Sequence, residues 1–409
     1  MMVGLDVLER IRSAAEESRD RIVGLVQEFI SIPSVSGDEG DLARALPRRM
    51  GELGFDQVVI DDVGNVIGRV RGLNSEVGAI LNGHLDTVPE ADMEQGFSPR
   101  LLDGADYGVD GQVIVGRGAC DMKGPLASMI MAGGILRRAC IRPLHDFIVT
   151  ASILEEVGGS VGSRRLVGGG LSGRLVVVGE PTGLKINLGH RGSVHVDVTT
   201  FGKSSHACSP ESGTNAIYLM APIIQAVESL DPRLTYHPTL GKASVAACNI
   251  AAFPGARNVV PSSCTLSVNF RTTPDLSADD VLGLLEQAIT PVAGRIGDRW
   301  TAEITMNSGN TYTGVSYNTP KIMRGLWSEP QGAPFEALKV AVELATERDA
   351  QLGSWRFATD GPCFSLDAGI PTYGFGPGDE AVAHSSSEHV PVDDLVAAAK
   401  AYALLGILA

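Results

Sequence analysis

The sequence predicts an α/β protein, with a main domain built on a mixed sheet flanked by helices and a smaller inserted α+β domain. Three observations predict this class. Strand-like apolar runs alternate with helix-like stretches from about residue 55 to 186. Separate strand-rich and helix-rich segments follow from 187 to 310. The alternating pattern of the first block returns after 311. The 409 residues leave room for two or three domains, and a hydrophobic content of 44% is ordinary for a protein with a sizeable core.

The first block opens with an amphipathic helical pattern, in which Leu8, Ile11, Ile22, Val26 and Ile30 recur at roughly helical spacing. Strand-like segments follow, namely "QVVIDDVGNVIGRV", "GAILNGH", "FIVTASILEE" and "RLVVVGE". The helix-like run "GPLASMIMAGGILRRA" lies between two of them. This alternation predicts a sheet in which some strands are parallel.

The second block contains the alternating segments "HRGSVHVDVTTFG" and "CTLSVNFRTT" and the helix-like segments "NAIYLMAPIIQAVESL" and "ADDVLGLLEQAITPV". They predict an insert with helices on one face of a sheet. The last block has a helix in "APFEALKVAVELATE", a strand and loop in "PTYGFGPG" and a closing helix in "VDDLVAAAKAYALLGILA". We therefore expect a discontinuous main domain, residues 1–186 and 311–409, and an inserted domain, residues 187–310.

Charge and cysteine content narrow the classes of protein. A formal net charge of -15 argues against a nucleic-acid partner, because phosphate binding needs clustered lysine and arginine. The six cysteines form no C-x-x-C pair, which favours a reduced, cytoplasmic setting. Neither a signal-peptide core nor a run of 18 apolar residues is visible, so we expect no membrane association.

Acidic and imidazole side chains follow the strand-like runs or lie in loops rich in glycine and serine. They are His84 and Asp86 in "ILNGHLDTVPE", Asp121 in "GRGACDMKG", Glu155 and Glu156 in "FIVTASILEE", Glu180 in "RLVVVGEPT" and His384 in "AVAHSSSEH". Each alone suits a solvated loop. Together they suit a ligand site beyond the carboxyl ends of the strands, which is where open α/β sheets bind ligands.

Two imidazoles and several carboxylates are a plausible ligand set for two zinc-like ions. One carboxylate must bridge if the ions are to lie about 3.5–4 Å apart. The adjacent Glu155 and Glu156 suit a division of labour, since one can bind metal while the other acts as general base towards a metal-activated water.

These motifs make the sequence recognisable over nearly its whole length. "GHLDTVP", "GRGACDMKG", "EEVGG", "GEPT", "GHRG", "SSHACSPESGTNA", "GFGPG" and "AHSSSEH" occur in an order that resembles the binuclear zinc amidohydrolases and peptidases. That family includes acetylornithine deacetylase, succinyl-diaminopimelate desuccinylase, aminoacylase and glutamate carboxypeptidase. The runs "GTNAIYLMAPI" and "FATDGPCFSLDAGIPTYGFGPG" look closest to a hydrolase branch linked to selenium and purine metabolism.

The resemblance implies a role for each residue of the metal site. His84, Asp121 and Glu180 would hold one zinc, and Asp121, Glu156 and His384 the other, with cobalt or manganese as alternatives. Glu155 would be the general base, and Asp86 would hydrogen-bond His84 and orient it. The resemblance also implies a cis peptide between Asp121 and Met122.

For the insert, the resemblance implies a lid that also forms a homodimer interface. His206 would reach the neighbouring subunit's site and stabilise the oxyanion. The residues implied to contact the small-molecule substrate are Asn258, Arg271, Gly376, Pro377 and Gly378.

The sequence also departs from the family. His190 in "GHRGS" replaces an arginine of the desuccinylases that helps to bind an acidic acyl group, which weakens that assignment. We expect the remaining histidines, His145, His195, His237 and His389, to be surface or core residues.

The leading functional expectation is hydrolysis of a linear amide in a small substrate that carries a carboxylate, such as an N-acyl amino acid or a dipeptide. Two alternatives remain open. One is hydrolysis of another C–N bond, as in a carbamoyl or arylamine group, and the other is a catalytically silent protein that binds a metabolite. The exact acyl group and side chain are not encoded in any motif.

Overall fold

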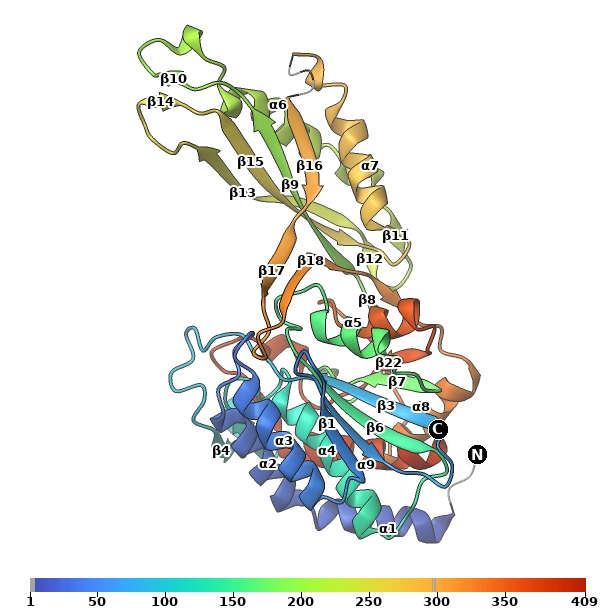
Figure 1. Ribbon diagram of the computed structural model, residues 1–409. Coiled ribbons are helices and arrows are strands. Elements are labelled where there is room, and N and C mark those ends of the chain that lie inside the picture. The colour runs from blue at the N-terminus through green and yellow to red at the C-terminus, as the bar shows by residue number, and fades with distance from the viewer. Residues whose placement is uncertain (1–3, 296, 298) are drawn as a thin grey trace.

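The computed structural model describes residues 4–295, 297 and 299–409 and shows two parts, a helix-covered main body and an elongated insert (Figure 1). The main body contains a nine-stranded sheet in the order β1-β2-β6-β3-β7-β22-β8-β20, with β21 paired to β8. The strands are β1 (Gln57–Ile60), β2 (Val66–Val70), β3 (Val77–His84), β6 (Asp146–Ser152), β7 (Leu175–Val178), β8 (Ile186–His190), β20 (Leu326–Trp327), β21 (Leu352–Trp355) and β22 (Thr372–Gly374).

This sheet is mixed, as predicted. The pairs β3–β6, β3–β7, β7–β22 and β8–β21 are parallel, and the remaining pairs are antiparallel. Strand β3 is buried along almost its whole length, because helices cover both faces of the sheet. This explains why the central strands appear in the sequence as continuous apolar runs.

Helices pack on both faces of the sheet. One face shares a core with α1 (Leu5–Glu16), α2 (Arg19–Ser31), α3 (Gly40–Glu52), α4 (Lys123–Arg138), α8 (Gly332–Thr346) and α9 (Val392–Leu408). The other face is covered by α5 (Val161–Gly168) and a helical turn, Cys363–Asp367. Alternate residues of each strand separate accordingly, with Leu81 in the first core and Ile80 in the second.

The insert is an antiparallel sheet in the order β13-β15-β9-β16, with β19 also paired to β9. Its strands are β9 (Gly192–Phe201), β13 (Ser244–Phe253), β15 (Ser263–Thr272), β16 (Trp300–Ile304) and β19 (Ile322–Met323). Helices α6 (Ala216–Glu228) and α7 (Ala278–Ile289) cover one face, where Val194 and Phe270 are buried with them. The chain enters the insert's sheet between β8 and β9 and leaves it between β19 and β20.

A long hairpin that extends from the insert makes non-covalent contacts with the main body. It consists of β17 (Met306–Asn310) and β18 (Ser316–Pro320), and we call residues 306–320 the bridging hairpin. At its tip, Tyr312 Oη donates to the carbonyl of Gly64 at 2.9 Å, and Thr313 Oγ1 donates to that of Asp62 at 2.9 Å. Asn307 Nδ2 lies 3.3 Å from the carbonyl of Gly158. The insert thus touches the main body far from the two covalent crossings (Figure 1).

Short elements complete the described chain. They are β4 (Arg100–Asp103), β5 (Gln112–Val115) and β23 (His389–Pro391) in one small sheet, the pairs β10 (Ser205–His206) with β14 (Val259–Val260) and β11 (Tyr236–His237) with β12 (Gly241–Lys242), and helical turns at Gly104–Tyr107, Pro210–Ser212, Asp231–Arg233, Ala293–Arg295 and Glu380–Val382. Within the described ranges, no helix has the length and apolar character needed to cross a bilayer.

Candidate metal centre

The predicted ligands gather at the edge where the parallel strands β3, β6 and β7 end. His84 is the last residue of β3, Glu155 follows β6 by three residues, and Glu180 follows β7 by two. Because these strands are parallel neighbours, their carboxyl ends meet at one edge of the sheet. Asp121 joins them from the loop before α4. Asp121, Glu155, Glu156, Glu180 and His384 line a cavity of about 530 Å³ between the main body and the insert.

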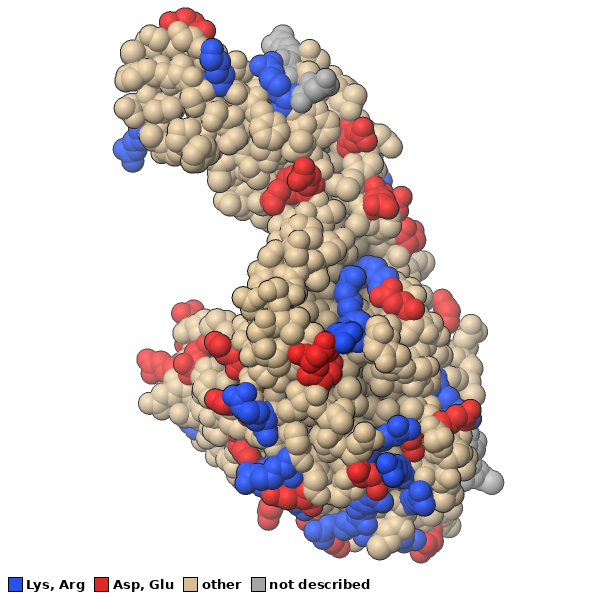
Figure 2. Space-filling view, in the orientation of Figure 1, with Lys and Arg blue, Asp and Glu red and all other residues tan. Residues whose placement is uncertain are grey.

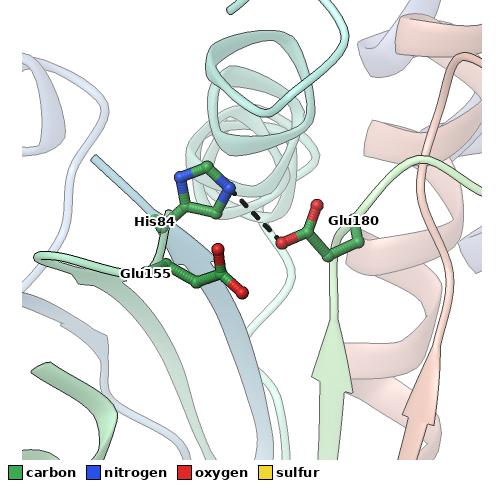
Figure 3. A group of neighbouring side chains, drawn as sticks. All are labelled: His84, Glu155 and Glu180. Atoms are coloured by element: carbon green, nitrogen blue, oxygen red, sulfur yellow. Dashed lines mark ion pairs between the residues drawn. The ribbon is translucent and has the colours of Figure 1, made fainter. Parts of the chain in front are cut away.

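His84 lies at the centre of the group. Its Nε2 is 2.9 Å from Asp121 Oδ1 and 3.3 Å from Glu180 Oε1, and Figure 3 shows its ring facing Glu180 with Glu155 beside it. Its Nδ1 is 2.8 Å from the backbone carbonyl of Asp86. A carbonyl only accepts, so Nδ1 carries the proton and Nε2 of the neutral ring is the nitrogen available to a ligand.

The predicted role of Asp86 requires a correction. Its carboxylate lies 3.7 Å from His84 Nδ1 and makes other hydrogen bonds. It accepts from the backbone N–H groups of Glu155 at 3.0 Å and Glu156 at 3.1 Å, and from Ser36 Oγ at 2.7 Å. β3 ends at His84, so strand alternation does not hold the Asp86 side chain on the face of His84. Asp86 thus orients His84 through its carbonyl, and its carboxylate positions the two glutamates.

Asp121 lies between the two imidazoles. Its Oδ1 faces His84 at 2.9 Å, and its Oδ2 faces His384 at 3.2 Å. Each oxygen thus faces a different histidine, as a bridging carboxylate requires. The Asp121–Met122 peptide is cis, which confirms the expectation drawn from the resemblance.

A buried ion pair behind Asp121 was missed in the sequence. Glu388 Oε1 accepts from the backbone N–H groups of Cys120 and Asp121, both at 3.1 Å, and its Oε2 pairs with Arg117. Arg117 and Glu388 are both almost fully buried. They belong to the motifs "GRGACDMKG" and "AHSSSEH", so the motifs contained the residues but gave no sign of their contact.

Glu156 and His384 form the second side of the group, with Glu156 Oε1 3.0 Å from His384 Nε2. His384 has a left-handed backbone, φ 61°, and its side chain is about half exposed at the mouth of the cavity. Two sets of ligand atoms lie within 4.8 Å of one another, His84 with Glu155 and Glu180, and His84 with Asp121 and Glu156.

The electrostatics of the group follow from burial and from crowding of like charges. Burial, with repulsion from Asp121, raises the pKa of Glu180 to about 8 and that of Glu156 to about 7. Burial also raises the pKa of Glu155 well above its usual value. Hydrogen bonds to Asp121 and Glu156 raise the pKa of His384 to about 10. Without a cation, the group therefore holds several protons.

These residues fit divalent metal ions. The donors are imidazole nitrogen and carboxylate oxygen, the types that zinc, cobalt and manganese take in proteins. Glu180 Oε2 is buried without a hydrogen-bond partner, although an unpaired carboxylate oxygen at such a depth is costly. A cation between the carboxylates would satisfy that oxygen and remove their mutual repulsion.

The insert supplies the opposite wall of the cavity. Arg271 lines it, as predicted, and has no ion-pair partner among the residues that the structure describes. His195, which we expected to be a surface or core residue, lines the cavity together with Lys321. The alternation of β9 carried the signal for His195, since it puts Ser193 and His195 on the face opposite the buried valines.

Other predicted residues lie outside this cavity. His206 is in β10 and Asn258 lies beside it, since the N–H of Ala207 donates to the carbonyl of Asn258 at 2.9 Å. Both are at the far end of the insert, near the labels β10 and β14 in Figure 1. Within one chain, the structure does not bring them to the metal centre.

Gly376, Pro377 and Gly378, which the resemblance implied as substrate contacts, form a loop that the structure does not bring to the cavity. The loop is buried and does not line the cavity. The N–H of Gly376 donates to Thr182 Oγ1 at 3.1 Å, and that of Gly378 donates to Asp394 Oδ2 at 3.3 Å, so neither is available to a substrate. The loop packs against the backbone of Glu180 and supports that ligand.

The remaining histidines have structural environments. His190 is fully buried, and burial lowers its pKa to about 4, while its Nε2 lies 3.0 Å from Thr359 Oγ1. His145 and His389 are buried, and His237 is partly exposed.

Comparisons with known proteins agree with this geometry. Residues 80–406 match the family described as peptidase family M20/M25/M40. The chain is 29% identical to the uncharacterized protein YgeY of Escherichia coli K12, over 97% of this chain and 96% of that protein. It is 28% identical to succinyl-diaminopimelate desuccinylase of Corynebacterium glutamicum, over 91% and 92% respectively. The fold resembles the crystal structure of aminopeptidase PepT from Bacillus cereus, with a TM-score of 0.72, 20% identity and coverage of 95% and 98%.

Proposed function

The chain belongs to peptidase family M20/M25/M40, and from this premise we propose that it hydrolyses a linear amide bond in a small substrate that carries a carboxylate. The observation that supports this most is the position of Asp121 between His84 and His384, with Glu155 beside His84 and Glu180. We favour an N-acyl amino acid or a dipeptide as substrate. The similarity to the selenium-linked branch stays a prediction.

In the proposed centre, His84, Asp121 and Glu180 would hold one divalent ion, and Asp121, Glu156 and His384 would hold a second. We favour zinc, with cobalt and manganese as alternatives; when bound, such ions polarise a carbonyl and lower the pKa of water. Glu155 takes the proton of the attacking water on a carboxylate oxygen and delivers it to the leaving nitrogen. The hydrogen bond from its N–H to Asp86 holds Glu155 in place for both transfers.

Arg271 is proposed to bind the substrate carboxylate. It lines the cavity and lacks an ion pair with Asp275 or any other acid in the described ranges, so its guanidinium fork is free for a bidentate partner. The insert then acts as a lid, because a substrate held by Arg271 and by the main body joins the two parts. We propose domain boundaries at the two crossings, residues 190–192 and 323–326, in place of the expected 186/187 and 310/311, because β19 pairs with β9 in the insert's sheet.

We also propose a homodimer formed through the insert. β13 is an edge strand with Ile250 48% and Phe253 70% exposed, and α6 exposes Ile217 and Tyr218. Figure 2 shows few charged side chains over the upper insert on the face in view. Exposed apolar side chains on an unpaired edge are typical of a surface that another chain covers. In such a dimer, His206 and Asn258 would serve the partner's cavity.

A substrate panel tests the proposed function. The zinc- or cobalt-loaded protein is incubated with N-acyl amino acids, dipeptides, N-carbamoyl amino acids and aryl amides, and the released amine is quantified by mass spectrometry. We expect turnover of at least one N-acyl amino acid or dipeptide, lost in Glu155→Gln. Turnover of carbamoyl or aryl substrates alone would favour the alternative of a hydrolase that acts on another C–N bond. Binding without turnover would favour a catalytically silent protein that binds a metabolite.

A further inference from the structure

The face of the insert that looks into the cavity carries a row of polar side chains set by strand register. On β15, Arg271 pairs with Ser193 of β9, and Asn269 pairs with His195. On the other side of β9, the register of β19 continues to Lys321, whose carbonyl accepts from the N–H of His195 at 3.3 Å. Since side chains alternate between faces, all five share the face opposite α6 and α7.

Two of these side chains are cations that form no ion pair with any acid that the structure describes. Among the described residues, neither Arg271 nor Lys321 forms an ion pair or a side-chain hydrogen bond. The acid on the same face, Asp197, has one oxygen bonded to Ser267 and the other to Thr305, both at 2.9 Å. The two cations also lower the pKa of His195, in addition to burial.

One acid lies on the opposite wall of the cavity, outside the metal centre. Glu380 accepts from the backbone N–H of Arg356 at 3.2 Å, and the Arg356 guanidinium lies 3.9 Å away. Arg356 therefore partly balances the charge of Glu380. Glu380 forms no ion pair with Lys321.

The distance between the backbone positions of Arg271 and Lys321 bears on whether they bind one anion or two. Neighbouring strands are about 4.8 Å apart, so the strands on either side of β9 are about 10 Å apart, and the two-residue offset adds about 7 Å along the strands. His195 lies between them. With the two backbones this far apart and one carboxylate filling the fork of Arg271, we assign Lys321 to a separate anion.

We infer that Lys321, with His195 beside it, forms a second anion-binding subsite, so that the preferred substrate is a linear amide with two carboxylates. One carboxylate binds Arg271 and the other Lys321. The second carboxylate belongs either to the side chain of an acidic amino acid or to a dicarboxylic acyl group. This inference rests on the proposed function.

Matched substrate pairs test it. N-acetylglutamate is compared with N-acetylglutamine, and N-succinylalanine with its succinamoyl analogue, which places the second charge on the amino-acid side or on the acyl side. We expect the wild-type protein to prefer the dianion at least tenfold in kcat/KM in one pair. Lys321→Gln should abolish that preference and leave kcat/KM for the monoanionic partner within about twofold. Lys339→Gln on α8, outside the cavity, controls for the loss of one charge.

A binding measurement separates failure of this inference from failure of the proposed function. Affinities of the same pairs are measured by calorimetry on zinc-loaded Glu155→Gln with and without Lys321→Gln. A preference for the dianion that depends on Lys321, without hydrolysis by the wild type, would retain the subsite and reject the amidase. The subsite would be overturned if the wild type hydrolysed dianion and monoanion with kcat/KM values within twofold of each other. It would also be overturned if Lys321→Gln lowered kcat/KM equally for both.

Discussion

Asp86 Oδ1 accepts a hydrogen bond from the backbone N–H of Glu155 at 3.0 Å, and Asp86 Oδ2 accepts one from the backbone N–H of Glu156 at 3.1 Å. The backbone of the proposed general base is thus held by a residue two positions after His84, a proposed metal ligand. This contact couples two strand ends that are distant in sequence, β3 and β6.

Asp86→Asn should weaken this coupling. An amide retains only one accepting oxygen, so one of the two N–H groups loses its partner, at a cost of roughly 1–3 kcal/mol in the free energy of unfolding. We expect lower kcat with KM nearly unchanged, since the general base is misplaced while the cavity is intact. Urea unfolding and steady-state kinetics measure both, and unchanged kcat would contradict the positioning role.

Glu155→Gln and Glu156→Gln should have different effects. Glu155→Gln should retain about two metals per chain and lose activity by orders of magnitude, because the glutamine amide cannot accept the proton of the attacking water. Glu156→Gln should lose metal as well, since Glu156 lies against His384 and Asp121, the carboxylate proposed to bridge the two ions. Metal analysis of both purified variants distinguishes them, and near-normal turnover in Glu155→Gln would reject its role.

Metal binding should release protons. In the metal-free protein the pKa of Glu180 is raised to about 8 and that of His384 to about 10, so at pH 7 both hold protons that metal must displace. Metal affinity should therefore rise from pH 6 to 8.5. Calorimetry in buffers of different ionisation enthalpy measures the proton release; a pH-independent affinity would contradict the description of the site.

The same shifts predict how pH affects the metal-free fold. A raised native pKa means that the native state binds more protons than the unfolded chain, so the contribution of Glu180 is present below about pH 4.5 and is lost as pH rises through about 8. Apo stability should fall over this window, and the metal-loaded protein should resist the fall. Chemical unfolding at several pH values, with and without zinc, provides the check.

Two inactive variants should complement each other if the dimer is as proposed. His206→Ala lacks the residue from the insert, and Glu155→Gln lacks the base, so a mixed dimer contains one cavity with both groups intact. We expect partial recovery of activity after subunit exchange. No recovery, with exchange proved by labelled subunits, would show that His206 does not act across the interface.

Arg271→Ala should lower kcat/KM on an N-acyl amino acid far more than on its amidated analogue. In the wild type, the amide should lose several kcal/mol of transition-state stabilisation because the arginine is left unpaired in the cavity. Equal kcat/KM for acid and amide in the wild type would exclude a required carboxylate and favour the carbamoyl or arylamine alternative.

Much of the fold could be predicted because its central strands are buried on both faces and its helices carry apolar stripes. Strand β13 was missed, since it is an exposed edge rich in alanine and shows no alternation. The bridging hairpin was missed as well, because its residues alternate only between partly and fully exposed positions. Helix α3 contains Pro47, which obscures a helical pattern.

The site was predictable to the extent that strand ends determine it. His84, Glu155 and Glu180 come together because parallel strands end at one edge. The pairing of Arg117 with Glu388 spans most of the chain and leaves no local pattern. The loop at Gly376 was expected to contact substrate, but its N–H groups donate to Thr182 and Asp394, which are distant in sequence and leave no local pattern.

The bridging hairpin has a mechanical consequence for the whole molecule. The two covalent crossings, residues 190–192 and 323–326, lie side by side because β8 pairs with β20 and β9 with β19. Alone, such a pair acts as one pivot, about which the insert can tilt in any direction. The docked tip at Tyr312 adds a second pivot at a distance (Figure 1). Two pivots define one axis, so a closure of the proposed lid would be confined to rotation about that axis while the tip is docked.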